Sequence, residues 1–134
     1  MTPASMERTF IAAGDRYSLF YRELRARLQE AGVQIVDTAG ESTATFSILY
    51  DETDQRVLSV SARNVPTEYE VYYTIQYAID GLDGRLLEIQ DLTVTRNYTY
   101  DSRLVLGKAR EEELLREAIA KDLVRIVLKQ ISTL

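Results

Sequence analysis

One segment, residues 67–80 with the sequence TEYEVYYTIQYAID, constrains the fold more than any other. Apolar or aromatic side chains fall at every second position, namely Tyr69, Val71, Tyr73, Ile75, Tyr77 and Ile79. Polar residues fill most of the positions between them. A period of two is the pattern of a strand with one buried face, so the chain is predicted to build a sheet that something covers on one side.

Shorter alternating stretches flank this segment. Residues 45–51 carry Phe46, Ile48 and Tyr50 in one phase, and residues 56–63 alternate again after the polar sequence DETDQR. We therefore predict a hairpin that turns at DETDQR, followed by a second turn at NVPT, whose proline cannot continue a ladder. Another short strand is predicted at residues 8–12.

Residues 85–101 predict a last, unusually long strand. Its apolar residues are odd-numbered at Leu87 and Ile89 and even-numbered from Leu92 onward. Because neighbouring residues of a strand point to opposite faces, this change of phase predicts a bulge or bend near Gln90 and Asp91.

Two amphipathic helices complete the pattern. The first is predicted between an N-cap at Asp15 and a terminating Gly32, and the second at residues 109–130, where apolar residues cover about half the circumference. The order strand, helix, antiparallel strands, helix predicts an α+β fold. We expect a two-layer sandwich with a mostly antiparallel sheet of four to five strands and both helices on one face.

Composition limits the size and the chemistry. The 134 residues, 46% of them hydrophobic, suit a single domain at residues 6–134 after a disordered leader at 1–5. The sequence has no His and no Cys, which excludes the usual general base, thiolate catalysis, Cys-bound zinc and disulfides. A net charge of −5 disfavours nucleic acid. We expect no enzyme activity, no cofactor and no metal.

Three polar features have ordinary interpretations. Asp51, Glu52 and Asp54 lack the glycine and the distal glutamate of a dedicated calcium loop, so they are interpreted as a solvated turn. Glu68 and Glu70 share one strand face, as paired catalytic carboxylates would, but solvated surface is the favoured interpretation. Tyrosines are frequent on the last two strands. Those out of phase with the buried face suit either a protein interface or a solubilising surface.

Cations gather at one end of the expected sheet. In an antiparallel meander, Arg63 at the NVPT turn, Arg103 and Lys108 all lie at the same end, beside the first N–H groups of the last helix. With the aliphatic segment at residues 104–106, they could bind an amphipathic anion. The alternative is a set of scattered surface cations with the aliphatics capping the core, and the acidic residues 111–113 count against bound phosphate.

The chain resembles the lipopolysaccharide-assembly lipoprotein family LptE, also called RlpB. The resemblance is carried by RLQEAGVQIVD, TEYEVYYTIQYAI and RNYTYDSRLVLGKAREEELLREAIAKDLVRIVLKQI, which together span most of the chain. It implies an outer-membrane lipoprotein on the periplasmic side that plugs the β-barrel protein LptD and helps deliver lipopolysaccharide to the outer leaflet. The resemblance implies that two basic residues implicated in lipopolysaccharide binding in that family correspond to Arg63 and Lys108. We expect Arg103 to be a weaker third contact because of its predicted position beside them, not because of the resemblance.

Some expectations depart from this family or compete with it. The family's mature chain begins with a lipid-modified cysteine, and this sequence has none, so membrane attachment is expected only through an anchor not represented in it. One rival hypothesis is an auxiliary periplasmic lipoprotein of another lipid-transport system. Another is a carboxylate-dependent hydrolase using Glu68 or Glu70.

Overall fold

The computed structural model describes residues 2–63, 66–99 and 107–134 of the chain. Its strands are β1 (Arg8–Ala12), β2 (Gln34–Val36), β3 (Ala44–Val60), β4 (Pro66–Gly81) and β5 (Gly84–Thr99), and its helices are α1 (Leu19–Glu30) and α2 (Lys108–Ile131). Two single 3-10 turns, η1 (Ala4–Met6) and η2 (Ala39–Glu41), precede β1 and β3. The five strands form one sheet in the order β2-β1-β3-β4-β5.

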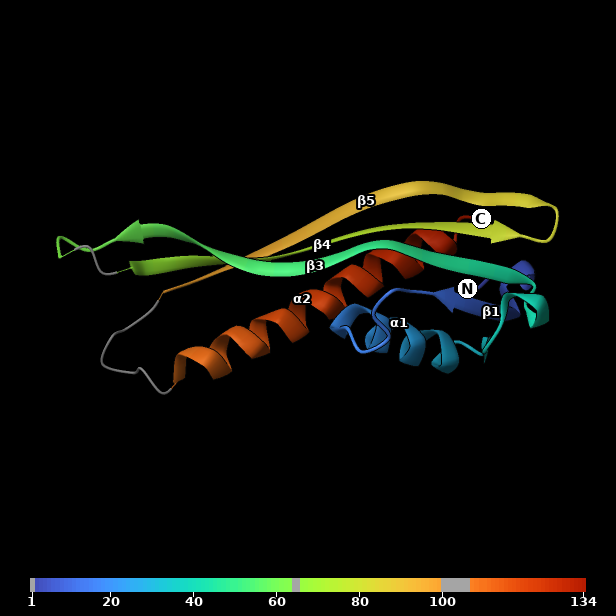
Figure 1. Ribbon diagram of the computed structural model, residues 1–134, viewed down its shortest axis with the longest axis horizontal. Helices are drawn as coiled ribbons and strands as arrows, with labels where there is room; N and C mark the ends of the chain where they lie inside the picture. Colours follow the sequence, from blue (N-terminus) through green and yellow to red (C-terminus); the bar gives the residue numbers. More distant parts are fainter. Residues whose placement is uncertain (1, 64–65, 100–106) are drawn as a thin grey trace.

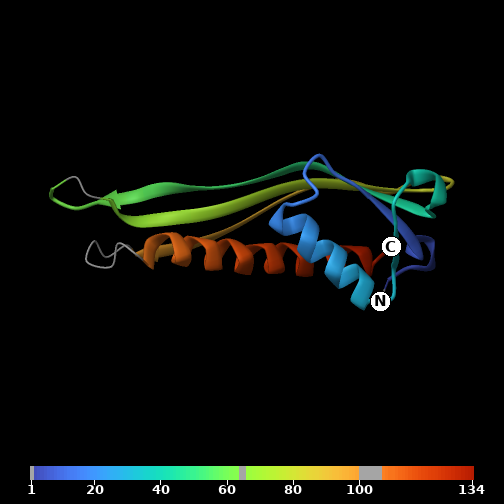
Figure 2. The same cartoon turned by 60° about the horizontal axis from the view of Figure 1, so that its bottom comes forward.

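The sheet is mixed. β1 runs parallel to both β2 and β3, whereas β3, β4 and β5 form an antiparallel meander. These three long strands give the molecule its elongated shape (Figure 1). Both helices lie on the same face of the sheet (Figure 2). The predicted α+β architecture, with two helices on one face, is therefore confirmed.

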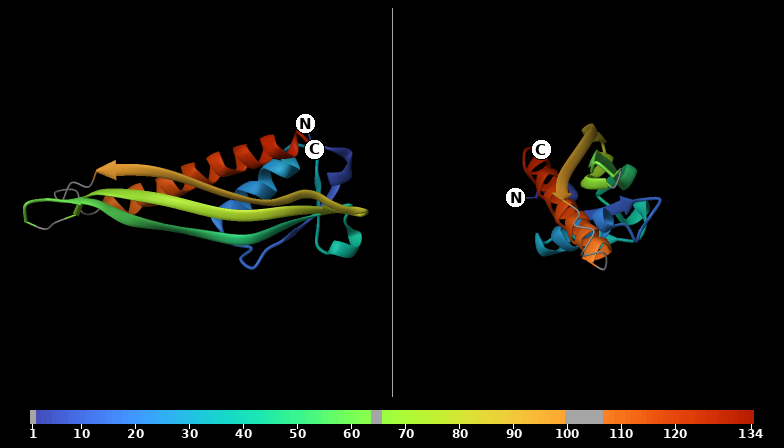
Figure 3. Two further views of the ribbon diagram at one scale, coloured as in Figure 1. Left: turned by 90° about the horizontal axis from the view of Figure 1, so that it is seen from above. Right: turned by 90° about the vertical axis from the view of Figure 1, so that its left-hand side faces the viewer.

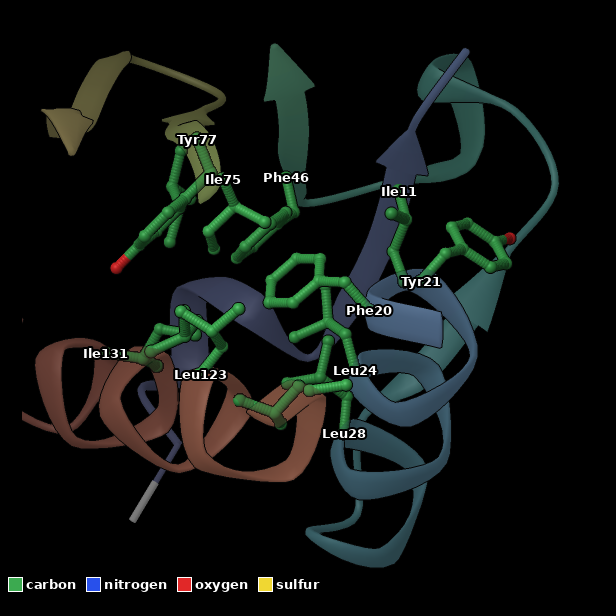
Figure 4. Packing of buried hydrophobic residues seen from close by; sticks show 14 of the residues in the cluster. Ile11, Phe20, Tyr21, Leu24, Leu28, Phe46, Ile75, Tyr77, Leu123 and Ile131 are labelled. Atoms are coloured by element: carbon green, nitrogen blue, oxygen red, sulfur yellow. The ribbon is translucent and has the colours of Figure 1, made fainter. Parts of the chain in front are cut away.

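The core lies between the sheet and the helices at the end that carries the short strands. The alternating residues of β4 supply its sheet side, and α1 and α2 contribute Phe20, Leu24, Leu123 and Ile131, all 0–1% exposed (Figure 4). The rings of Phe46 and Tyr77 stack with centroids 4.7 Å apart. The period of two in residues 67–80 thus marks the face that the helices cover, as predicted.

β3 corrects one prediction: DETDQR is not a turn. Residues 51–56 continue the strand and pair one by one with β4, from Asp51 opposite Ile75 to Arg56 opposite Glu70. The hairpin predicted within residues 45–63 was therefore wrong. The polar residues are compatible with a strand because the even-numbered ones point to the uncovered face of the sheet, where Glu52, Asp54 and Arg56 are exposed.

A bulge at Leu49 changes the phase of β3. Ile48 pairs with Tyr77 and Tyr50 with Gln76, so β3 carries one extra residue between these two pairs. Before the bulge Phe46 is buried, and after it the odd-numbered residues face the helices. Tyr50, which was predicted to share the face of Phe46, is consequently 47% exposed.

The bulge also turns Asp51 toward the start of α1. Its carboxylate accepts hydrogen bonds from the hydroxyls of Ser18 and Tyr73, each at 2.5 Å. Ser18 in turn caps the helix by accepting from the N–H of Tyr21 at 3.0 Å, and the N–H of Phe20 donates to the Tyr73 oxygen at 3.1 Å. The cap is therefore Ser18 rather than the predicted Asp15.

β5 contains the predicted irregularity, slightly earlier in the chain. The register shifts between the pairs Tyr77–Gln90 and Ile79–Leu87, which places the extra residue at positions 88–89 instead of 90–91. Ile89 is 55% exposed as a result, although its phase with Leu87 had suggested burial. Gly32 follows α1 with a φ of 91°, the left-handed conformation that favours glycine at a helix end.

Candidate functional site

The hairpin of β3 and β4 extends past the first turn of α2 (Figures 1 and 2). We call residues 57–63 and 66–68 the hairpin tip. Within the tip, the Ser59 hydroxyl lies 3.0 Å from both the Thr67 hydroxyl and a Glu68 carboxylate oxygen. These contacts join the two strands beyond the part of the sheet that the helices cover.

Two of the three predicted cations, Arg63 and Lys108, are described, and both lie at the end of the molecule that carries the hairpin tip. Arg63 is exposed in the turn of the tip, where its backbone N–H donates to the Ser61 hydroxyl at 3.2 Å. Lys108 is the first residue of α2, and the antiparallel register places the end of β5 beside the start of β4. Arg103 and the aliphatic residues 104–106 lie outside the described residues.

Sequence reasoning missed the aliphatic side chains of the tip itself. Val57, Leu58 and Val60 are 49%, 45% and 53% exposed. The alternation noted in residues 56–63 did not indicate that Leu58 and Val60 would be exposed, because alternation alone does not tell where the covering layer ends. The sequence feature that could have indicated this exposed surface is the group of apolar residues immediately before the NVPT turn.

A polar link joins the base of the tip to α2. Tyr69 and Tyr98 stack across β4 and β5 with centroids 5.3 Å apart, and the Tyr98 hydroxyl donates to the carboxylate of Glu112. Burial, together with the neighbouring Glu112, raises the pKa of the Tyr98 phenol, which therefore stays protonated and able to donate. This link fixes the first turns of α2 against the distal part of the sheet.

The acidic start of α2 is partly neutralised by its own contacts. Glu112 is engaged by Tyr98, and Glu113 forms an ion pair with Arg110 at 3.4 Å. One turn further along, Arg116 has a buried Nε without a hydrogen-bond partner. The ion pair with Arg110 offsets part of the negative charge of residues 111–113, whereas the hydrogen bond from the neutral Tyr98 leaves the charge of Glu112 unchanged.

The remaining polar candidates have structural partners. Glu70 forms an ion pair with Arg56 at 2.7 Å, and the Arg56 guanidinium lies 4.7 Å from the centroid of the Tyr72 ring on the uncovered face. Glu68 contacts Ser59. No group of acidic residues that could hold a metal ion occurs in the described part of the chain. Nor does any helix there combine the length and apolarity that crossing a bilayer requires.

Comparison with known proteins identifies relatives of this fold. No curated protein matches the chain significantly by sequence. Among solved structures, rare lipoprotein B from Shewanella oneidensis matches with a TM-score of 0.80 and 25% identity, covering 94% of each chain. The uncharacterized lipoprotein B from Nitrosomonas europaea matches with a TM-score of 0.79 and 26% identity, covering 98% of this chain and 84% of its own.

A third structure shares the fold at lower identity. The minor lipoprotein from Acinetobacter baumannii has a TM-score of 0.78 and 21% identity, covering 98% of this chain and 94% of its own. The profile of the family described as "LptE: Lipopolysaccharide-assembly" matches residues 6–131, which is nearly the whole chain. The protein thus belongs to the LptE family of lipopolysaccharide-assembly proteins, as its sequence motifs had indicated.

Proposed function

We propose that this protein is a non-enzymatic subunit of the lipopolysaccharide export machinery of the outer membrane. It binds lipopolysaccharide at the hairpin tip during delivery to the outer leaflet. The observation that carries the proposal is that Arg63, the start of α2 and the exposed residues Val57, Leu58 and Val60 lie at one end of the molecule. The molecule itself belongs to a lipopolysaccharide-assembly family.

The chemistry of the tip matches the two parts of such a ligand. Lipopolysaccharide carries phosphate groups next to acyl chains, so a binding surface needs cations beside apolar side chains. Arg63 supplies a guanidinium fork that suits phosphate, and Lys108 and Arg103 supply further positive charge in this proposal. The N–H groups in the first turn of α2 favour an anion at the helix start, which lies at the same end of the molecule as the tip (Figure 1).

The proposed partner is an LptD-type β-barrel, which the protein plugs from the periplasmic side of the outer membrane while a lipid anchor holds it there. Support comes from family membership and from the shape of the molecule. The long sheet and α2 form a narrow body with both termini near the end opposite the tip (Figure 3). An anchor joined to the N-terminus would therefore leave the tip pointing away from the attachment point.

Charge reversal tests the binding site. Arg63→Asp and Lys108→Asp should each weaken lipopolysaccharide binding about tenfold to a hundredfold, the range for losing one charge-assisted hydrogen bond. Binding is measured by displacement of a fluorescent lipopolysaccharide. Lys129→Asp makes the same change of charge on an exposed residue near the other end of α2 and serves as the control.

The outcomes separate the site from the partner. Equal binding by the tip variants and the control, with unchanged thermal melting, contradicts the site. Failure of the full-length precursor to co-purify with a large outer-membrane barrel contradicts the plug and favours an auxiliary lipoprotein of another lipid-transport system.

A further inference from the structure

β3 has a long edge that no strand covers in the described part of the chain. β4 pairs with it along its whole length, but on the other side β1 pairs only with residues Ala44 to Ser47. From Ile48 to Val60 the backbone groups that face away from β4 therefore have no ladder partner there. Seen from above, β3 forms one side of the molecule for most of its length (Figure 3). Such an edge is a template for another strand.

Exposed apolar side chains are concentrated on this edge. Five of the eleven large hydrophobic residues exposed in the described part of the protein lie on β3, namely Leu49, Tyr50, Val57, Leu58 and Val60. They fall in two groups, one at each end of the uncovered stretch. A strand docked along the edge would cover Val57, Leu58 and Val60, whereas Leu49 and Tyr50 border residues 13–15 of the loop between β1 and α1. If the docked strand were an antiparallel copy of β3, each copy would cover the same residues of the other.

The charges between these two groups favour a copy of the same strand. Glu52 and Asp54 are exposed on the uncovered face of the sheet, and neither forms an ion pair with another residue that the structure describes. Arg56 lies on the same face, two residues further along, with its side chain 58% exposed beside Glu70. The stretch thus presents acid, acid and base at alternate positions, which is the pattern of a partly self-complementary edge.

Only some antiparallel registers place opposite charges of the two copies next to each other. Antiparallel pairing centred on Thr53 would set Glu52 opposite Asp54 of the second copy in both halves, and like charges directly opposite repel. Pairing centred on Gln55 sets Asp54 opposite Arg56 of the second copy, twice, with no like-charge pair. In that register Thr53 lies opposite Val57 on the other face.

We propose that two copies of the protein associate through their β3 edges, antiparallel and centred on Gln55. The dimer is a state of the free protein and does not depend on the proposed function. The contact is short, so the association belongs to the weak, transient class of interfaces. The geometry is isologous, as expected for a two-fold dimer, because the same edge of each copy contacts its counterpart.

Sedimentation velocity tests this at protein concentrations from about 10 µM to about 1 mM, the range in which small interfaces associate. The wild-type protein should shift from monomer to dimer within it. Asp54→Lys and Arg56→Glu should each raise the dissociation constant at least about tenfold, because each sets like charges opposite one another in both halves. The double variant restores both pairs and should dimerise like the wild type.

Two controls keep the result specific. Asp83→Lys makes the same change of charge as Asp54→Lys on an exposed residue of the turn between β4 and β5 and should leave dimerisation unchanged. Thermal melting checks that Arg56→Glu, which also loses the Glu70 ion pair, still folds; if it does not, Asp54→Lys and its control carry the test. The proposal is overturned if the wild type is a monomer at every concentration. It is also overturned if Asp54→Lys leaves the dissociation constant unchanged, or if the double variant folds but stays monomeric.

Discussion

Replacing Tyr73 by Phe tests whether the bulge in β3 organises the start of α1. The Tyr73 hydroxyl is the acceptor for the N–H of Phe20, a residue that is 0% exposed, and it donates to Asp51. A buried N–H left without an acceptor costs about 1–3 kcal/mol. The lost bond to Asp51 adds roughly 1 kcal/mol, because the half-buried carboxylate keeps Ser18 and can reach water. We expect a loss of about 2–4 kcal/mol in the free energy of unfolding.

Tyr77→Phe is the matched control. Tyr77 lies on the same strand and is equally buried, but its hydroxyl donates to the side chain of Gln130 and accepts from no backbone N–H of the residues that the structure describes. Its loss should cost about 0.5–1.5 kcal/mol. At about 4 °C per kcal/mol for a domain of this size, the melting temperature falls by roughly 8–16 °C for Tyr73→Phe and roughly 2–6 °C for the control. Circular dichroism and urea titration measure both. Equal losses in the two variants would refute the role assigned to the Phe20 N–H.

Two further predictions concern a helix end and an ion pair. Gly32 has a φ of 91°, so Gly32→Ala should destabilise the protein by about 1 kcal/mol. Gly40 has free space around it and no positive φ, so Gly40→Ala should cause no such loss. Parallel urea titrations compare the free energies of unfolding of the two variants. Arg96 hydrogen-bonds Asp122 at 2.7 Å and lowers the pKa of that carboxyl. Because the folded pKa is depressed, the stabilisation is present above the unfolded value of about 3.9 and is lost as the pH falls through the folded value. The melting temperatures of the wild type and Arg96→Gln should therefore differ at pH 6, and the difference should shrink as the pH falls below about 3.9. A difference that stays constant over this range would contradict the assignment.

The sequence predicted the layers of the fold because those depend on periodicity. The period of two in residues 67–80 and the apolar stripe of α2 each identify a buried face without any knowledge of the partner element. Their agreement with the structure is clearest at Tyr73, Tyr77 and Leu123, which are all 0–1% exposed. The same physics explains why the bulge in β5 could be predicted from its change of phase.

The course of β3 could not be read in the same way. DETDQR has the composition of a turn, and its place in a strand depends on pairing with β4, a contact between residues far apart in the sequence. The bulge at Leu49 has no local signal, because Tyr50 continues the alternation of Phe46 and Ile48. For the site, the topology correctly brought Arg63 and Lys108 to one end, whereas the exposure of Leu58 and Val60 depends on where α2 begins.

The continuous course of β3 has a consequence for the proposed function. Had the chain turned at DETDQR, Arg63 would lie beside the core, and every change near it would also alter packing. Instead the tip is separated from the core by the distal half of the sheet, where Asp51 contacts the N-cap of α1 and Tyr98 contacts α2. Surface substitutions away from the core usually change stability by no more than about 0.5 kcal/mol. The long hairpin therefore lets ligand chemistry at the tip vary with little effect on the stability of the fold that presents it.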